Sequence, residues 1–535
     1  MERQRWIVEL CFNLGVPSFR IFAAVLLAIC LQAETCFSQA PNAAGQTPPA
    51  ANQQTPAVQE PPQPGANPAP EGNPEKKISP QDAQELFQSA EEILRFASKQ
   101  SGLPIKHEVK HRLTSRDEVQ RFIEQRMKDD PDAKRMESSE FVMKKFGLLP
   151  YDFNLRKFMV GMLREQVAGF YDTKTKTMNL LDWLPPEVQK PVMAHELTHA
   201  LQDQFVDLEK WENGGKPERK KLTLPEQLAL DEVTVARQSV TEGQAMLVLI
   251  DYSLAPMGRT SADAPDAVKM MEDQMMDSAG SPIFASAPLY IKRAMMFAYR
   301  EGTEFEEQVL RNDGKSGAFR GTLENPPQDT HEVMQPHSYL AGQHIPLLTV
   351  PNYDKVLGRD WEQADFGALG QFDVNVLMEI YADAATAKAL TPGWRGGYYY
   401  AAHRKGKPAE DVAFIYVSKW ADESTAADFA HIFADSWKQR YKTLRVATAA
   451  KQPNVVRKET DAGTVSVEQV GKVVIAIESF TEAEAGKLRS AAMEANAGGS
   501  QTDAGLRFPN RPMWEAWSHA AMRGLTLNRF VAAGP

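Results

Sequence analysis

Cysteine is nearly absent from this sequence. The 535 residues include three cysteines, Cys11, Cys30 and Cys36, and none occurs after position 36. The rest of the chain therefore cannot form a disulfide, and it has no thiolate to act as a nucleophile or to bind a metal ion. Any metal site after residue 36 must use nitrogen and oxygen ligands.

The apolar run near the N-terminus is too short to cross a bilayer. It covers residues 21–31, after Arg3, Arg5 and Arg20, whereas a spanning helix needs about 20 apolar residues. Basic residues before a short apolar core are typical of a signal peptide. We expect residues 1–38 to be removed on export to the periplasm or the medium, which leaves no membrane span. An uncleaved anchor is the alternative.

Excess positive charge is absent as well. The chain has 60 Lys and Arg against 70 Asp and Glu, a net charge of −10, and this does not suggest a nucleic-acid partner. Residues 39–78 are rich in Pro, Ala and Gln and hold almost no large apolar side chains, so we expect a disordered linker. The remainder is globular by composition, and its oligomeric state is not indicated.

One short motif carries chemistry. Residues 195–199 read His-Glu-Leu-Thr-His, an H-E-x-x-H pattern inside an uncharged run that fits a buried helix. On a helix, His195 and His199 lie one turn apart on one face, so both imidazoles can bind one Zn²⁺. Glu196 can then act as general base toward water. The motif predicts a zinc-dependent peptidase that acts on protein or peptide substrates.

A second H-E-x-x-H occurs at residues 107–111, and its surroundings are different. Pro104 precedes it, and Ile105 and Val109 alternate with polar residues, which indicates a short strand over 105–113. Residues four apart on a strand are separated by about 13 Å. Two histidines at that distance cannot share one metal ion, so this copy is not expected to bind metal.

A third ligand is expected from a later helix. A metzincin would place Gly at 202 and His at 205, but these positions are Gln202 and Phe205. Residues 228–250 have a helical pattern that contains Glu242, beside Gly243. We expect Gly243 to let this helix pack closely against the metal helix. Asp231 and Glu232 compete for the ligand role, although acidic residues at a helix start often serve only the helix dipole.

These residues together resemble a zinc metallopeptidase of the gluzincin type, and more narrowly a group of bacterial exported metallopeptidases. The resemblance implies one Zn²⁺ per chain, held by His195, His199 and Glu242, with Glu196 as catalytic base. Two positions depart from such relatives: Met246, where thermolysin-like gluzincins carry Asp, and Gln335, where His is expected. The matching segments are 167–172, 195–204, 242–245, 325–330 and, more weakly, 393–397.

The resemblance also implies a fold. We expect an α+β protein with a zincin-like core at 79–350, made of a short sheet and metal-binding helices, and a smaller α+β module with a tail at 351–535. Residues 167–172 and 177–182 predict a hairpin, one strand of which would pair with extended substrate. Helices are expected at 82–99, 116–128, 134–146, 153–165, 289–299, 304–310, 424–441, 481–495 and 511–523, and further strands at 412–417, 454–458, 464–470 and 472–479.

Several side chains are candidates for supporting roles. Asp203 lies four residues after His199 and could orient its ring. A donor to the reaction oxyanion is also needed. Endopeptidase action is favoured, because the G-x-M-E-N-like anchor of aminopeptidases is missing. An inactive scaffold that binds envelope components and a zinc amidohydrolase of cell-wall material are the alternative functions. The candidate oxyanion donors are Tyr299, His331, His337 and Tyr339.

Overall fold

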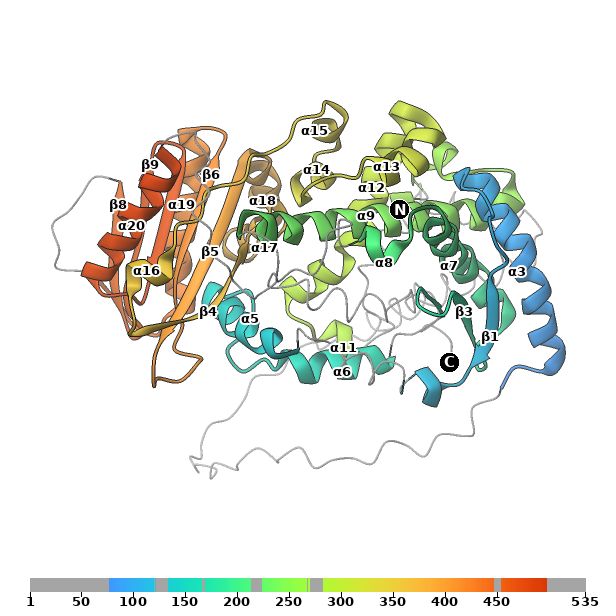
Figure 1. Cartoon of the computed structure of the whole chain (residues 1–535), viewed down its shortest axis with the longest axis horizontal. Coiled ribbons are helices and arrows are strands. Elements are labelled where there is room, and N and C mark those ends of the chain that lie inside the picture. Colours follow the sequence, from blue (N-terminus) through green and yellow to red (C-terminus); the bar gives the residue numbers. More distant parts are fainter. Residues whose placement is uncertain are drawn as a thin grey trace, which may run out of the picture.

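Two bodies of secondary structure lie side by side in the molecule (Figure 1). The computed structural model describes residues 77–119, 121, 133–165, 169–212, 224–266, 268–269, 282–446 and 454–497. The fold is mixed α+β, as expected, with a three-stranded sheet of order β1-β3-β2 and a seven-stranded antiparallel sheet of order β4-β5-β6-β10-β9-β8-β7.

The first body surrounds the small sheet with long helices. In this sheet β1 runs parallel to β3, and β2 pairs antiparallel with β3, so β2 is an edge strand. The elements of the first body are α3 (Pro80–Ser101), β1 (Lys110–Thr114), α5 (Ala133–Phe146), α6 (Leu155–Glu165), β2 (Phe170–Asp172), β3 (Thr177–Leu181), α7 (Pro186–Val206), α8 (Leu208–Trp211), α9 (Leu224–Leu254), α11 (Pro282–Ala285), α12 (Leu289–Lys315), the π-helical turn η4 (Ser316–Gly321), α13 (Thr322–Glu324), α14 (Thr330–Met334) and α15 (Pro336–Leu340).

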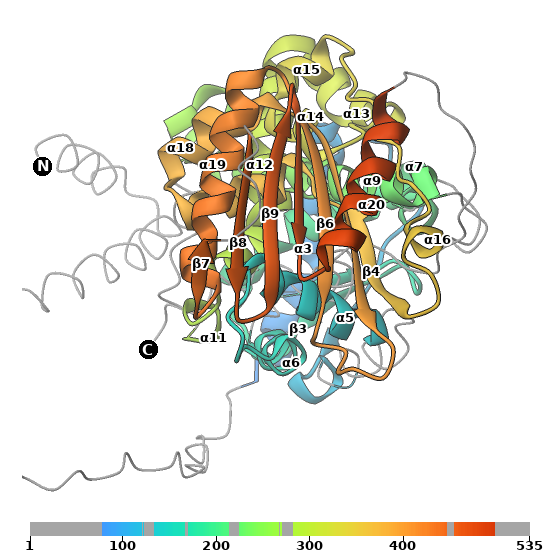
Figure 2. The ribbon, with the colours of Figure 1, turned by 90° about the vertical axis from the view of Figure 1, so that its left-hand side faces the viewer.

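The second body is the large sheet with helices on both faces, as Figure 2 shows for α19 and α20. Along β6, Phe414 and Tyr416 belong to the hydrophobic cluster that includes α19, whereas Ile415 and Val417 belong to the cluster that includes α20, because side chains alternate across a strand. Its elements are α16 (Tyr353–Leu357), β4 (Trp361–Ala368), α17 (Gln371–Tyr381), α18 (Ala384–Leu390), β5 (Trp394–Arg404), β6 (Ala413–Trp420), α19 (Glu423–Arg440), β7 (Leu444–Val446), β8 (Val455–Thr460), β9 (Gly463–Val470), β10 (Val473–Glu478) and α20 (Glu482–Ala497).

Most of the expected elements are present, with shifted ends. The expected hairpin is present as β2 and β3. The strand expected at 105–113 is also present, but as β1 it covers Lys110–Thr114 and so begins and ends later. Residues 289–299 and 304–310 belong to one helical stretch of α12, because the intervening residues contain no proline and remain helical; α12 is kinked only later, at Gly314. The expected helix at 511–523, and most of the one at 116–128, lie outside the described residues.

A single hydrophobic cluster joins the two bodies. It runs from Leu86 on α3 to Ala476 on β10. The side chain of Phe146 at the end of α5 packs against Phe414, with 4.4 Å between ring centroids. Nearby, the Ser139 hydroxyl donates a hydrogen bond of 3.0 Å to the buried Asp365 carboxylate. The core is therefore continuous across residue 350.

Helices α9 and α12 cross at a pair of glycines. A Cβ placed on Gly243 would lie 2.2 Å from the carbonyl oxygen of Gly302, and one on Gly302 would lie 2.2 Å from the carbonyl oxygen of Ser239. Both distances are impossible for carbon, so the crossing requires both glycines. The expectation that Gly243 faces the metal helix was wrong, since the close approach is to α12.

We therefore predict that Gly243→Ala destabilises the protein by about 3 kcal/mol or more, because backbone atoms would have to move apart. The matched control is Gly486→Ala in α20, where a new Cβ meets nothing within 4 Å. That change should stabilise by about 0.5–1 kcal/mol. Chemical denaturation measures both. Equal stability of the two variants would contradict the close crossing.

Candidate metal centre

The H-E-x-x-H motif lies in the middle of α7, which is buried along most of its length. Pro186 starts the helix, where its missing N–H costs nothing. His195, Glu196 and Thr198 are at most 1% exposed. Two imidazoles and a carboxylate in such an apolar setting would be costly unless partnered.

Three ligand atoms meet beside α7. The Nε2 atoms of His195 and His199 lie 3.0 Å apart. The Oε2 atom of Glu242, from α9, lies 3.1 Å from His195 Nε2 and 3.4 Å from His199 Nε2. Zinc bonds of about 2.0–2.2 Å in a tetrahedron separate neighbouring ligand atoms by about 3.3 Å. The three residues could therefore hold a metal ion.

The charges of these groups are strongly coupled. Burial alone would lower the pKa of His199, but the carboxylates of Glu242 and Glu196 raise it to about 9. Burial alone would raise the pKa of Glu242, but the charge of His199 and hydrogen bonds from both histidines lower it to about 2. Burial lowers the pKa of His195. The Glu242 carboxylate therefore favours the charged form of His199, whereas burial disfavours the charged form of His195.

The side chain of Glu196, on α7, reaches the edge strand β2. Its Oε2 atom accepts a hydrogen bond of 2.9 Å from the backbone N–H of Tyr171, the central residue of β2. A carboxylate that accepts a backbone hydrogen bond is held in one orientation. The strand edge, the carboxylate and the three ligand atoms are thus neighbours.

Tyr299, on α12, is the oxyanion candidate that lies at the centre. Its ring stacks on His195 with centroids 6.2 Å apart. Burial, the charges of Glu242 and Glu196, and a hydrogen bond to Glu242 raise the pKa of Tyr299 well above its ordinary value. The hydroxyl therefore stays protonated and can donate.

The other three oxyanion candidates have different surroundings. His331 is buried and its Nδ1 lies 2.6 Å from the Gln371 side-chain oxygen. The Tyr339 hydroxyl donates to the backbone oxygen of Asn325 at 2.7 Å. His337 is exposed at the start of α15. None of the hydrogen bonds or ring contacts described for these three residues joins them to His195, His199 or Glu242.

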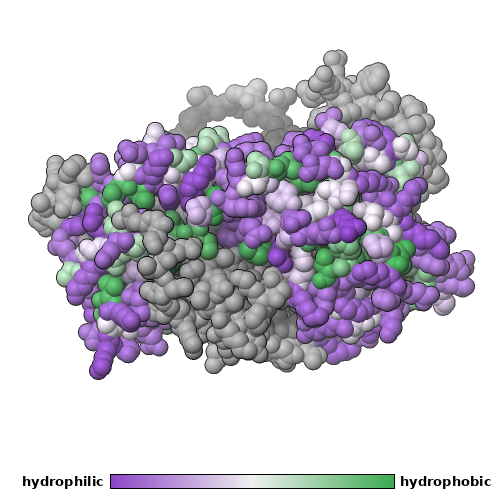
Figure 3. All heavy atoms as spheres, turned by 45° about the horizontal axis from the view of Figure 1, so that its top comes forward, coloured by the Kyte–Doolittle hydropathy of each residue, from purple (hydrophilic) through white to green (hydrophobic). Residues whose placement is uncertain are grey.

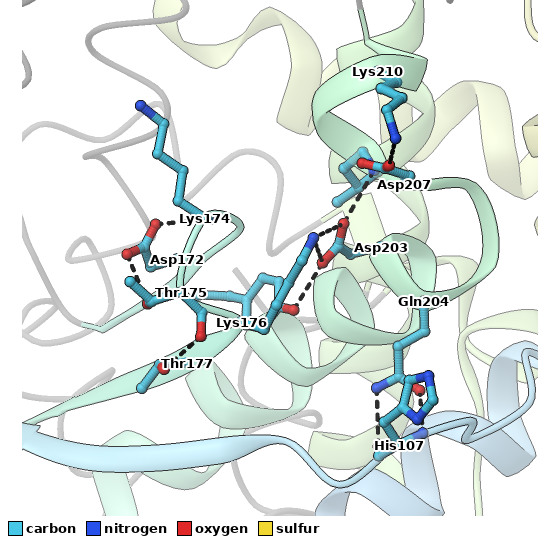
Figure 4. A network of polar contacts seen from close by, with 12 residues as sticks. His107, Asp172, Lys174, Thr175, Lys176, Thr177, Asp203, Gln204, Asp207 and Lys210 are labelled. Carbon is cyan, nitrogen blue, oxygen red and sulfur yellow. Dashed lines mark hydrogen bonds and ion pairs between the residues drawn. The ribbon is translucent and has the colours of Figure 1, made fainter.

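Asp203 does not orient His199 as expected. Its carboxylate accepts bonds from the Tyr171 hydroxyl at 2.8 Å, from Lys176 Nζ at 2.7 Å and from the Leu208 N–H (Figure 4). These contacts fasten the hairpin turn to the end of α7. The partner of His199 is instead Gln202, which the H-E-x-x-H pattern does not include. Its position three residues after His199 was the available signal.

The second H-E-x-x-H copy is not helical, in agreement with the prediction. His111 lies in β1 with its ring 4.7 Å from that of Phe87, and His107 precedes the strand. The backbone of His107 both donates to and accepts from the side chain of Gln204 on α7 (Figure 4). Among the residues that the structure describes, only His195, His199 and Glu242 form a group suited to a metal ion.

Glu232, the rival ligand, joins the two bodies of the protein. Its Oε2 atom accepts from the N–H and hydroxyl of Thr330 at 2.9 and 2.7 Å. Its carboxyl group also packs against Gly370, where a Cβ would lie 2.2 Å away. Glu232 thus links α9 to the N-termini of α14 and α17. It stands within α9 rather than at its start, and the side chain of Asp231 lies outside the described residues.

Hydrophilic residues predominate on the face seen in Figure 3, where hydrophobic ones form small separate patches. Within the described parts of the chain, no helix combines the length and apolar character needed to cross a membrane. Comparison of the chain with protein-family models, with curated proteins and with solved structures gave no match.

The environment of Glu232 predicts a pH-dependent stability. Burial and the charges of Asp373 and Asp329 raise the pKa of Glu232 to about 8. A carboxyl with a raised folded pKa favours folding fully below its unfolded pKa of about 4.5, and this contribution is lost as pH rises through about 8. The melting temperature should therefore fall between pH 5 and pH 8.5, and less so in Glu232→Gln. The exposed Glu362→Gln should keep the wild-type slope, and an equal slope in Glu232→Gln would contradict this reading.

The third ligand can be tested by metal binding. With zinc as the probe ion, Glu242→Ala should weaken binding by at least about 100-fold, because it removes a candidate ligand outright and not only an outer contact. Glu232→Gln should bind zinc as the wild type does. Competition with a chromophoric chelator gives both affinities. If the Glu232 variant loses zinc and the Glu242 variant keeps it, the ligand assignment is wrong.

Proposed function

We propose that this protein is an exported zinc-dependent peptidase with a zincin-like core, as its resemblance to gluzincins implies. The observation that carries the proposal is the triangle of His195, His199 and Glu242 ligand atoms with Glu196 beside it. Two imidazoles and one carboxylate form a catalytic zinc set, because three protein ligands leave a fourth position for water or substrate. Export rests on the leader at 1–38, which lies outside the described residues.

The donor set favours zinc over harder cations. Magnesium and calcium prefer oxygen ligands, whereas imidazole nitrogen suits zinc and other late transition metals. Bound zinc supplies Lewis acidity, which acidifies water and polarises a carbonyl group.

Glu196 is the general base in this proposal. It takes a proton from the attacking water and returns it to the leaving amine as the peptide bond breaks. The Tyr171 N–H holds its carboxylate in place. We assign the oxyanion donor to Tyr299, because its protonated hydroxyl already contacts the ligand Glu242.

The edge strand β2 is the feature that favours a peptide as the substrate in this proposal. Among the residues that the structure describes, β3 alone pairs with it in the small sheet. An extended peptide can add to such an edge through backbone hydrogen bonds, which do not depend on its side chains. Because β2 also contacts Glu196, a chain bound there would lie next to the base.

We predict that Glu196→Gln lowers peptide cleavage by about 10²–10⁴-fold, the usual contribution of general acid–base catalysis. Zinc content should stay at one per chain, because the ligands are unchanged. The matched control is Glu108→Gln, the same motif position in the second copy, which should cleave normally. Peptide-library cleavage and metal analysis give the two readouts.

Two results would contradict the proposal. A zinc-loaded wild type that is inert toward a broad peptide library would favour the inactive scaffold. Cleavage confined to the amide bonds of cell-wall fragments would favour the amidohydrolase.

A further inference from the structure

The ring of His199 is held by a chain of side-chain amides. Its Nδ1 atom lies 2.8 Å from Gln202 Oε1. Gln202 Nε2 lies 3.0 Å from the backbone oxygen of Thr241 and 2.9 Å from Gln244 Oε1. Gln202 and Gln244 are both 0% exposed. Two fully buried amides with every polar atom bonded form a rigid network.

The donor and acceptor of each hydrogen bond between His199, Gln202 and the Thr241 backbone can be assigned. The backbone oxygen of Thr241 can only accept, so the atom of Gln202 that faces it is the N–H₂ group. The other end of the amide, toward His199, is therefore the oxygen. This oxygen also can only accept, so His199 carries its hydrogen on Nδ1. In the neutral ring that binds a metal ion, the lone pair is therefore on Nε2, the atom that faces His195 Nε2 and Glu242 Oε2.

Gln244 is oriented by the same reasoning. Its N–H₂ group faces the backbone oxygens of Ala318 and Phe319, each at 3.0 Å, and the Thr322 hydroxyl at 2.9 Å. Both carbonyls belong to the π-helical turn η4. A backbone carbonyl oxygen has two lone pairs, so it can accept from Gln244 in addition to a bond within the helix. The Gln244 oxygen is thereby left to accept from Gln202.

Gln202 also links the two helices that carry the ligands. It belongs to α7, three residues after His199, and it binds the backbone of Thr241 on α9, next to Glu242. One side chain therefore fixes both the ring orientation of a ligand and the position of the helix that provides another. A carboxylate could not replace it, because an ionised oxygen would face the Thr241 carbonyl.

We propose that Gln202 is a positioning residue for the metal site, and that Gln244 extends its action to η4. Gln202 holds His199 in the tautomer that presents Nε2 to the metal, and it sets the distance between His199 and Glu242. This inference rests on the proposed metal site. It assigns the support of the ligand ring to a neutral amide, which adds no charge to the centre.

The test is a set of zinc affinities measured by chelator competition on the purified chain. Gln202→Met should bind zinc about 10–100-fold more weakly, the usual effect of losing a partner of a metal-bound histidine. Gln202→Glu should also bind more weakly, because it cannot donate to Thr241. The matched control is Gln204→Met on the same helix. The side chain of Gln204 accepts hydrogen bonds from the backbone N–H groups of Lys106 and His107. It should stay within about 2-fold of the wild type.

Substitution of Gln244 and spectroscopy of Gln202→Met distinguish a loss of ligand positioning from a loss of folding. Gln244→Met should weaken zinc binding by a smaller factor, and the double variant with Gln202→Met should be no weaker than Gln202→Met alone, because both act through one chain. The Co²⁺ form of Gln202→Met should have an altered visible spectrum while its circular dichroism matches the wild type.

Wild-type zinc affinity in a folded Gln202→Met would overturn the inference, as would additive effects of the two substitutions. If Gln202→Met fails to fold, an unchanged zinc affinity in Gln244→Met overturns it. Failure of the wild type to bind zinc would instead contradict the proposed metal site itself, so the two outcomes are distinct.

Discussion

The proposed metal site requires three ligand atoms from two different helices to lie within about 3.3 Å of one another, and much of the structure serves this requirement. His195 and His199 satisfy it between themselves because they are one helical turn apart. Glu242 satisfies it only if α9 crosses α7 at one height and rotation. The Gly243–Gly302 contact sets how closely α9 and α12 pack, and the bond from Gln202 to the Thr241 backbone sets α9 against α7.

The outer contacts extend this arrangement to the whole protein. Tyr171 and Asp203 fasten the β2–β3 hairpin to α7, so the strand edge stays beside Glu196. Glu232 joins α9 to α14 and α17, and through them to the large sheet. The metal helices are therefore embedded in a continuous core and do not form a separate unit. The proposed hydrolytic activity would need pre-organisation of this kind, because the reacting groups must be in place before the reaction begins.

The sequence was informative where a local pattern decides the structure. The metal helix, the hairpin and the strand nature of the second H-E-x-x-H follow from residue spacing. Glu242 was selected from a helical pattern that contains Gly243, although the role expected of that glycine was wrong. Contacts between distant segments could not be predicted in this way. Gly302, the partner of Gly243, is 59 positions further along the chain. Asp203 and Gln202 are adjacent in the sequence, and only the fold determines which one faces His199.

The account depends most directly on where a metal ion binds. Crystals grown with zinc and measured at the zinc absorption edge would locate it in an anomalous difference map. We predict one strong peak per chain, bonded to His195 Nε2, His199 Nε2 and Glu242 at about 2.0–2.2 Å. A peak at His107 and His111, or a fully ordered site with no peak, would contradict the account.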